Sequence, residues 1–194
     1  MKKTVILCMT LAAGLVACNN QGSDKDSVEK ADSTNQVKMD SSTTAQPAIA
    51  TDQETTDFLV KAANGGMTEV KAAEIASTKS SNKSITDFAA MMKTDHGAAN
   101  SEVIALAQKR NVTLPTSVSD NSQKELDDMA KMNGKDFDKD YVKAMVKGHE
   151  ETVDMFKKAS DKVKDSEVKI FIDNTLPTLQ KHLDAIKQIQ KNLK

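Results

Sequence analysis

Apolar residues recur at helical spacing from residue 51 to the C-terminus, and this periodicity constrains the fold more than any other feature of the chain. Side chains three or four positions apart lie on one face of a helix. Glycine and proline are scarce in this region, and no alternation of β-branched residues typical of strands stands out. The length suits a single domain. The sequence therefore predicts one all-α domain over residues 51–194.

Four long helices and one short helix account for this domain. Thr51 and Glu54 fit a capping box at the first N-terminus. Pro115 stops the second helix, because proline disfavours helical geometry in the residue before it, and Pro177 is expected to kink the last helix. The long helices are predicted over about 52–79, between the break at 81–84 and the stop at 111–115, over about 135–160 and over about 166–192, with the short helix over about 120–132.

Each long helix carries a stripe of residues that is expected to face a common core. Two tight connections and one longer connection, which holds the short helix, indicate two antiparallel hairpins joined by a crossover. This is an antiparallel four-helix bundle of ferritin-like type. The predicted inward residues are Phe58, Ala62, Met67, Val70, Ala73, Ile85, Phe88, Met92, Ala99, Val103, Leu106, Tyr141, Met145, Val153, Phe156, Val168, Phe171, Ile172, Leu179, Leu183 and Ile186.

The N-terminus has the pattern of a bacterial lipoprotein signal peptide. Lys2 and Lys3 precede an apolar run over 5–16 that is too short to cross a bilayer, and the run ends in Leu15-Val16-Ala17-Cys18. We expect cleavage of residues 1–17 and acylation of Cys18, which would anchor the chain to a membrane of the bacterial cell envelope, with palmitate among the chains. The expected place is the outer membrane, facing the periplasm or the surface. An ordinary secretory signal with an incidental cysteine is the alternative.

Composition excludes several classes of function. Cleavage would remove Cys8 and acylation would consume Cys18, so neither a disulfide nor cysteine chemistry is expected. The 27 basic residues are interleaved with 28 acidic ones and form no basic patch, which argues against a nucleic-acid partner. Residues 18–50 are polar and poor in large apolar side chains, which is typical of a disordered tether.

Four residues that can bind metals fall on the apolar stripes, one on each long helix. Eleven residues make about three helical turns and seven make about two, so residues at these separations share a face. These spacings relate Glu69 to Phe58, His96 to Ile85, His182 to Phe171 and His149 to Phe156. The chain has only these three histidines. All four residues lie near the middle of their helices, which could bring them to one level of the bundle.

Three neutral imidazoles and a carboxylate suit copper, zinc or iron. Met92 and Met145 precede His96 and His149 by one turn and would favour reduced copper. The alternative is a set of core histidines satisfied by backbone carbonyls or by a neighbour such as Asp95, in a core filled with methionine. A di-iron centre is disfavoured, because the Glu-x-x-His pattern is missing: Lys93, Val146 and Leu179 stand three residues before the histidines.

Several ordered motifs resemble a bacterial family, the domain of unknown function numbered 4142. They are Phe58-Leu-Val-Lys-Ala-Ala-Asn-Gly-Gly-Met67-Thr-Glu69-Val70, Phe88-Ala-Ala-Met-Met-Lys-Thr-Asp95-His96, Ala99-Asn100-Ser-Glu102, Phe137-Asp138, Tyr141-Val-Lys-Ala-Met145-Val-Lys-Gly-His149 and Thr175-Leu-Pro177-Thr-Leu-Gln-Lys-His182-Leu183. The resemblance covers about 56–190 and implies a ferritin-like bundle on secreted or envelope proteins, with the motif glutamate and histidines at Glu69, His96, His149 and His182. It implies no reaction.

One position departs from the pattern that the resemblance implies. Gly148 stands before the second motif histidine, where an acidic residue like Asp95 is expected. Such an acid would orient the imidazole from behind. Its absence makes His149 the least certain member of the site.

Three classes of function remain open. The first is an envelope lipoprotein whose bundle acts as a binding module without turnover, so no catalytic residue is assigned. The second is a ferritin-like protein that binds a transition metal through its inward glutamate and histidines. The third is a structural bundle that docks other envelope proteins or a second copy of the chain.

Overall fold

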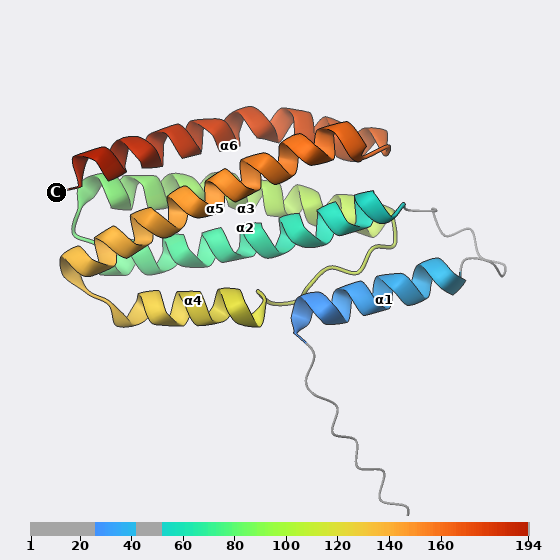
Figure 1. The fold of residues 1–194 in the computed structure, drawn as a ribbon, viewed down its shortest axis with the longest axis horizontal. Helices are drawn as coiled ribbons and strands as arrows, with labels where there is room; N and C mark the ends of the chain where they lie inside the picture. Colours follow the sequence, from blue (N-terminus) through green and yellow to red (C-terminus); the bar gives the residue numbers. More distant parts are fainter. Residues whose placement is uncertain (1–25, 42–51, 194) are drawn as a thin grey trace, which may run out of the picture.

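The computed structural model describes residues 26–41 and 52–193, which form six α-helices and no strand (Figure 1). The predicted all-α class is confirmed. Within the described ranges, no helix is both long and apolar enough to cross a membrane. The helices are α1 (Ser27–Ser41), α2 (Gln53–Lys79), α3 (Lys83–Lys109), α4 (Asp120–Lys131), α5 (Gly134–Lys162) and α6 (Ser166–Asn192).

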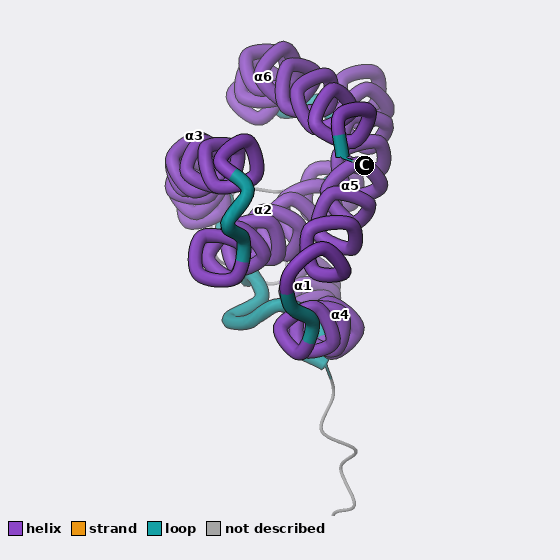
Figure 2. The backbone as a smooth tube through the Cα atoms, turned by 90° about the vertical axis from the view of Figure 1, so that its left-hand side faces the viewer, coloured by secondary structure: helices purple, strands orange, loops and turns teal. Residues whose placement is uncertain are grey.

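The four long helices form the predicted bundle of two antiparallel hairpins. Helix α2 packs mainly on α3 and α5 packs mainly on α6, while α2 also contacts α5 and α3 contacts α6. Figure 1 shows α4 running back along the bundle, so that α5 starts at the end opposite to that where α3 stops. In Figure 2 the long helices surround a common interior, and α1 and α4 lie outside α2 and α5. This connectivity is the one expected of a ferritin-like bundle with one crossover.

Helix boundaries agree with the predictions to within about two residues, because local capping groups set them. Asp165 accepts from the backbone N–H of Val168 at 3.1 Å at the start of α6, and Ser119 accepts from that of Ser122 at 3.2 Å at the start of α4. One prediction changes at α2. Its N-cap is Asp52, which accepts from the backbone N–H of Thr55 at 2.9 Å, whereas Thr51 lies outside the described residues.

The predicted stripes form the core. Of the predicted inward residues, all are buried except Met67, Val70 and Ala99, which are half-buried. Phe58 contacts the rings of Phe156 and Phe171, with centroids 5.0 and 6.3 Å away, so aromatic side chains from α2, α5 and α6 meet at one level. This level lies three helical turns from Glu69 on α2 and from His182 on α6, and two turns from His149 on α5.

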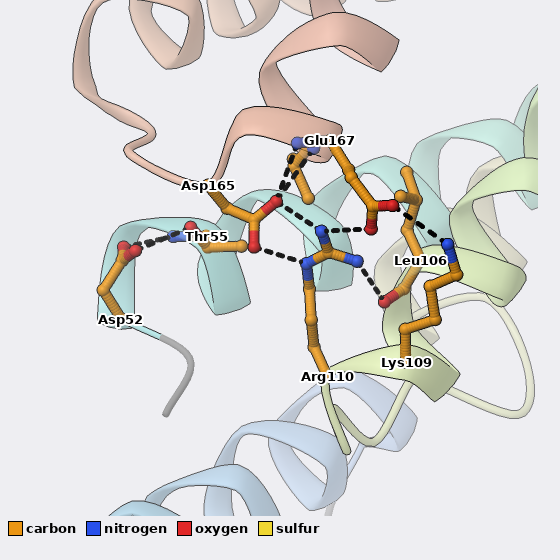
Figure 3. A network of polar contacts seen from close by, with 8 residues as sticks. Asp52, Thr55, Leu106, Lys109, Arg110, Asp165 and Glu167 are labelled. Carbon is orange, nitrogen blue, oxygen red and sulfur yellow. Dashed lines mark hydrogen bonds and ion pairs between the residues drawn. The ribbon is translucent and has the colours of Figure 1, made fainter. Parts of the chain in front are cut away.

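A buried arginine ties the end of α3 to the start of α6 (Figure 3). The guanidinium of Arg110 donates from Nε to Oδ2 of Asp165 at 2.8 Å, from Nη2 to Asp165 Oδ1 and to Glu167 Oε2, and from Nη1 to the carbonyl of Leu106 at 3.0 Å. These hydrogen bonds from Arg110 hold the pKa of Asp165 below its ordinary value. The network fixes one end of the bundle.

Helix α1 corrects part of the predicted tether over 18–50. Residues Ser27–Ser41 are helical, because polar groups fasten them to the loop that follows α3. The amide of Asn35 donates to the carbonyl of Thr113 at 2.9 Å and accepts from its N–H at 2.7 Å, and Ala31 is buried against the bundle. The tether was predicted from its few large apolar residues, and composition carries no sign of such hydrogen bonds to a distant loop. The signal peptide, Cys8, Cys18 and the rest of the tether lie outside the described residues.

Candidate metal centre

The structure brings the three histidines together in the middle of the bundle. His96 lies on α3, His149 on α5 and His182 on α6, and their exposed fractions are 5%, 0% and 2%. The ring centroids form a nearly equilateral triangle with sides of 5.4, 5.7 and 5.7 Å. One nitrogen from each ring lies within 4.8 Å of the other two. The inward positions expected from helical spacing are therefore confirmed.

His96 is oriented by Glu69, which α2 contributes. The Nδ1 atom of His96 lies 3.0 Å from Oε2 of Glu69, and both side chains are buried. Because the carboxylate accepts, the proton of the neutral imidazole belongs on Nδ1. The Nε2 atom then carries a lone pair, and this buried atom has no hydrogen-bond partner among the described residues.

His149 is oriented by its own helix. Its Nδ1 atom donates to the carbonyl of Met145 at 2.8 Å and lies 3.4 Å from Oε1 of Glu69. The lone pair of this imidazole is thus on Nε2, which is also buried without a partner in the described chain. A Cβ atom at Gly148 would lie 3.7 Å from the same Glu69 oxygen. This is an ordinary contact distance, but an acidic side chain at Gly148 would bring a second carboxyl group near the buried Glu69, so the departure at this position is consistent with a functional His149.

His182 is oriented by Asp95, in the opposite tautomer. Its Nε2 atom donates to Oδ2 of Asp95 at 2.8 Å, which leaves the lone pair on Nδ1. That atom likewise has no partner in the described part of the chain. Asp95 was expected behind the imidazole that follows it, His96, but it contacts the imidazole of the last helix instead. Sequence adjacency gave no signal for this long-range pairing.

The three imidazoles therefore lie together inside the protein, and each has one buried nitrogen without a partner among the described residues. Buried nitrogens normally have hydrogen-bond partners, and satisfied core histidines would leave none of these atoms alone. Burial also lowers the pKa values of His149 and His182. Neutral imidazole is the commonest metal ligand among protein side chains. The arrangement can hold a metal ion, and each ring is backed by an acceptor as metal-binding histidines usually are.

Glu69, predicted as a ligand, lies beside Nδ1 of His96 and Nδ1 of His149. Among the described residues, the atoms close enough to share one ion come from His96, His149 and His182, without Glu69. Its burial raises the pKa of the Glu69 carboxyl, but the neighbouring His96 and the other two imidazoles outweigh burial and lower it, so a carboxylate is retained. We assign Glu69 to orienting His96 and balancing charge.

An aromatic side chain packs against two of the histidines. The ring of Phe88 contacts those of His149 and His182, with centroids 6.1 and 6.5 Å apart. Met92 and Met145 are buried in the same core. Burial and the charge of Glu69 raise the pKa of Tyr141, whose buried hydroxyl has no partner among the described residues. The sequence placed Tyr141 on the core stripe but gave no signal of this unpartnered hydroxyl.

The comparisons with known proteins agree with the resemblance of the motifs. A family model described as a domain of unknown function, DUF4142, matches residues 38–189. No curated protein and no solved structure matches the chain. The matched region runs from the end of α1 to the last turns of α6 and includes Glu69 and all three histidines. The chain therefore belongs to the DUF4142 family.

Proposed function

We propose that this bundle binds one transition-metal ion through Nε2 of His96, Nε2 of His149 and Nδ1 of His182. Two observations support the proposal. One nitrogen from each ring lies within 4.8 Å of the other two, and each ring has one buried nitrogen without a partner among the described residues. Metal–nitrogen bonds of about 2.0–2.1 Å place tetrahedral ligands about 3.4 Å apart. Small rotations of the rings would complete the site.

Charge favours a divalent ion. Imidazoles bind metals in their neutral form, and the two carboxylates behind them, Glu69 and Asp95, supply two negative charges. A divalent cation would balance these charges, and imidazole ligands suit zinc, copper or iron among such ions. Reduced copper would balance the charge of buried Glu69 alone, and the charge of Asp95, whose side chain is 39% exposed, would be left to the solvent.

The exposed apolar side chains are scattered, which favours metal binding over the docking of another protein as the role of the bundle. The large exposed apolar residues of the described chain are Val37, Ile104 and Ile170, on three different helices. Single apolar residues of this kind are ordinary on a protein surface, whereas docking surfaces expose contiguous patches. The proposed role is thus metal binding without turnover, in storage or buffering of the ion.

Metal titration of the purified full chain tests the proposal. We expect one equivalent of zinc or cobalt per chain by calorimetry and by elemental analysis. His182→Ala should abolish this uptake, because one of three ligands is lost, whereas Lys181→Ala on the exposed face of the same helix should leave it unchanged. Absence of uptake of zinc, copper and iron by the folded wild type would overturn the proposal.

The membrane location is proposed on the sequence pattern at Cys18. Acylation there would hold the bundle at the envelope, where it would meet metal ions entering or leaving the cell. Mass spectrometry of the protein from a bacterial host should find an acylated N-terminal cysteine and loss of residues 1–17. Cys18→Ser should release the protein from the membrane fraction. An unmodified Cys18 in the membrane-associated wild type would contradict this part of the proposal.

A further inference from the structure

A cavity of about 40 Å³ adjoins the three histidines and shares two of them. His96 and His182 line it together with the carboxylates behind them, Glu69 and Asp95, whereas His149 does not. The cavity therefore lies on the side of the site that α3 and α6 form. Its volume suits a ligand of two or three non-hydrogen atoms.

Small residues keep this cavity open. Ala62 on α2 and Ala99 on α3 line it, where larger apolar side chains would fill the space. Gly66 also lines it, and a Cβ atom there would lie 1.9 Å from Oδ1 of Asn100. The glycine thus lets the Asn100 side chain lie directly against α2. The hydroxyl-bearing side chains of Thr175 and Thr178 complete the wall on α6.

The described chain offers three ligands to the ion, which leaves a fourth coordination position open. Structural zinc sites have four protein ligands, whereas sites with three keep the fourth position for water or another small molecule. Glu69 Oε2 and Asp95 Oδ2 contact Nδ1 of His96 and Nε2 of His182, the ring nitrogens opposite those proposed as ligands. The second oxygen of Glu69, Oε1, has no hydrogen-bond partner among the described residues but lies beside Nδ1 of His149, at 3.4 Å. No further histidine, cysteine or carboxylate of the described chain joins the convergent group.

We propose that the bound ion takes its fourth ligand from this cavity, as a small exchangeable donor: water, or an anion the size of azide. The inference rests on the metal binding proposed above. A divalent ion with Glu69 and Asp95 carries no net charge, so a monoanion is not repelled. The cavity thus makes the metal centre a site that small molecules reach.

Cobalt(II) in the full chain, titrated with azide, tests this inference. The visible absorption of the cobalt protein should change with a saturable one-to-one dependence on azide. Ala99→Leu should fill the cavity and weaken the apparent azide affinity about tenfold or more, with cobalt uptake retained. Ala90→Leu, at an exposed position of the same helix, is the matched control and should behave as wild type. Thr178→Leu blocks the opposite wall and serves as a second, independent variant.

The outcomes separate the two proposals. Absence of one-to-one cobalt uptake by the wild type would overturn metal binding itself. Normal cobalt uptake with a spectrum that azide leaves unchanged would overturn only the fourth-ligand inference and would indicate a sealed site. An azide response that persists equally in Ala99→Leu and Thr178→Leu would exclude the cavity as its route. If both variants fail to bind cobalt, the wild-type azide response alone decides whether a small ligand reaches the ion.

Discussion

Replacement of Glu69 by glutamine separates an orienting carboxylate from a metal ligand. In the structure, Oε2 accepts from Nδ1 of His96 at 3.0 Å, and Oε1 lies 3.4 Å from Nδ1 of His149. Glu69→Gln keeps the shape and one acceptor but removes the negative charge behind two imidazoles. Loss of such a partner typically weakens metal binding 10- to 100-fold, which corresponds to about 1.4–2.8 kcal/mol.

The same substitution should have little effect on folding without metal. The carboxylate is 5% exposed and has one close hydrogen-bonding partner, so its burial is costly. Removal of the charge should leave the free energy of unfolding of the apo protein within about 1 kcal/mol of wild type, or raise it. The thermal stabilisation that added zinc produces should fall with the loss of affinity.

Competition calorimetry against a chelator measures the affinity, and urea unfolding measures the apo stability. Glu74→Gln, at an exposed position of the same helix, is the matched control and should change neither quantity. An unchanged metal affinity in Glu69→Gln would refute the orienting role. Complete loss of uptake by a folded protein would instead make Glu69 a direct ligand, as the sequence first predicted.

Three further predictions follow from contacts elsewhere in the fold. Arg110 lowers the pKa of Asp165. Their ion pair therefore stabilises the fold above the ordinary aspartate pKa, and this stabilisation is lost as the pH falls through the lowered pKa of Asp165. In urea titrations, the free energy of unfolding of Asp165→Asn should accordingly fall less than that of wild type between about pH 6 and about pH 3. Gly66→Ala should displace the Asn100 side chain, because the added Cβ would lie 1.9 Å from Asn100 Oδ1. In an Asn100→Ala background, where this clash is absent, Gly66→Ala should raise the free energy of unfolding by about 1 kcal/mol through helix propensity, and by less than this in the wild-type background. The same change in both backgrounds in urea unfolding would contradict the contact. Asn35→Ala should release α1 and speed its amide hydrogen exchange while exchange in α2–α6 stays unchanged; unchanged protection of α1 would show that the amide pair does not hold it.

Much of the bundle could be predicted because its signals are local. Caps, prolines and the period of apolar residues are all within a few positions of the boundaries that they set, and α6 begins and ends where the pattern predicts. Helix α1 escaped prediction because its support is long-range. Asn35 pairs with the backbone of Thr113, 78 positions away, and nothing near Asn35 indicates this.

In the candidate site, too, local sequence signals could be predicted and long-range contacts could not. Helical angle identified the inward face of Glu69 and of all three histidines, but angle carries no distance, and only packing brings the rings within 5.4–5.7 Å. The roles of the carboxylates depend on that packing as well. Asp95 contacts His182 and not its neighbour in sequence, and Glu69 lies behind the ring of His96. The membrane anchor at Cys18 stays a prediction.

X-ray absorption at the zinc edge tests the central claim most directly. The full chain loaded with one equivalent of zinc should show three imidazole nitrogens at about 2.0–2.1 Å and one further light ligand at a similar distance. A coordination shell with fewer than three imidazole nitrogens would contradict the proposed three-histidine site.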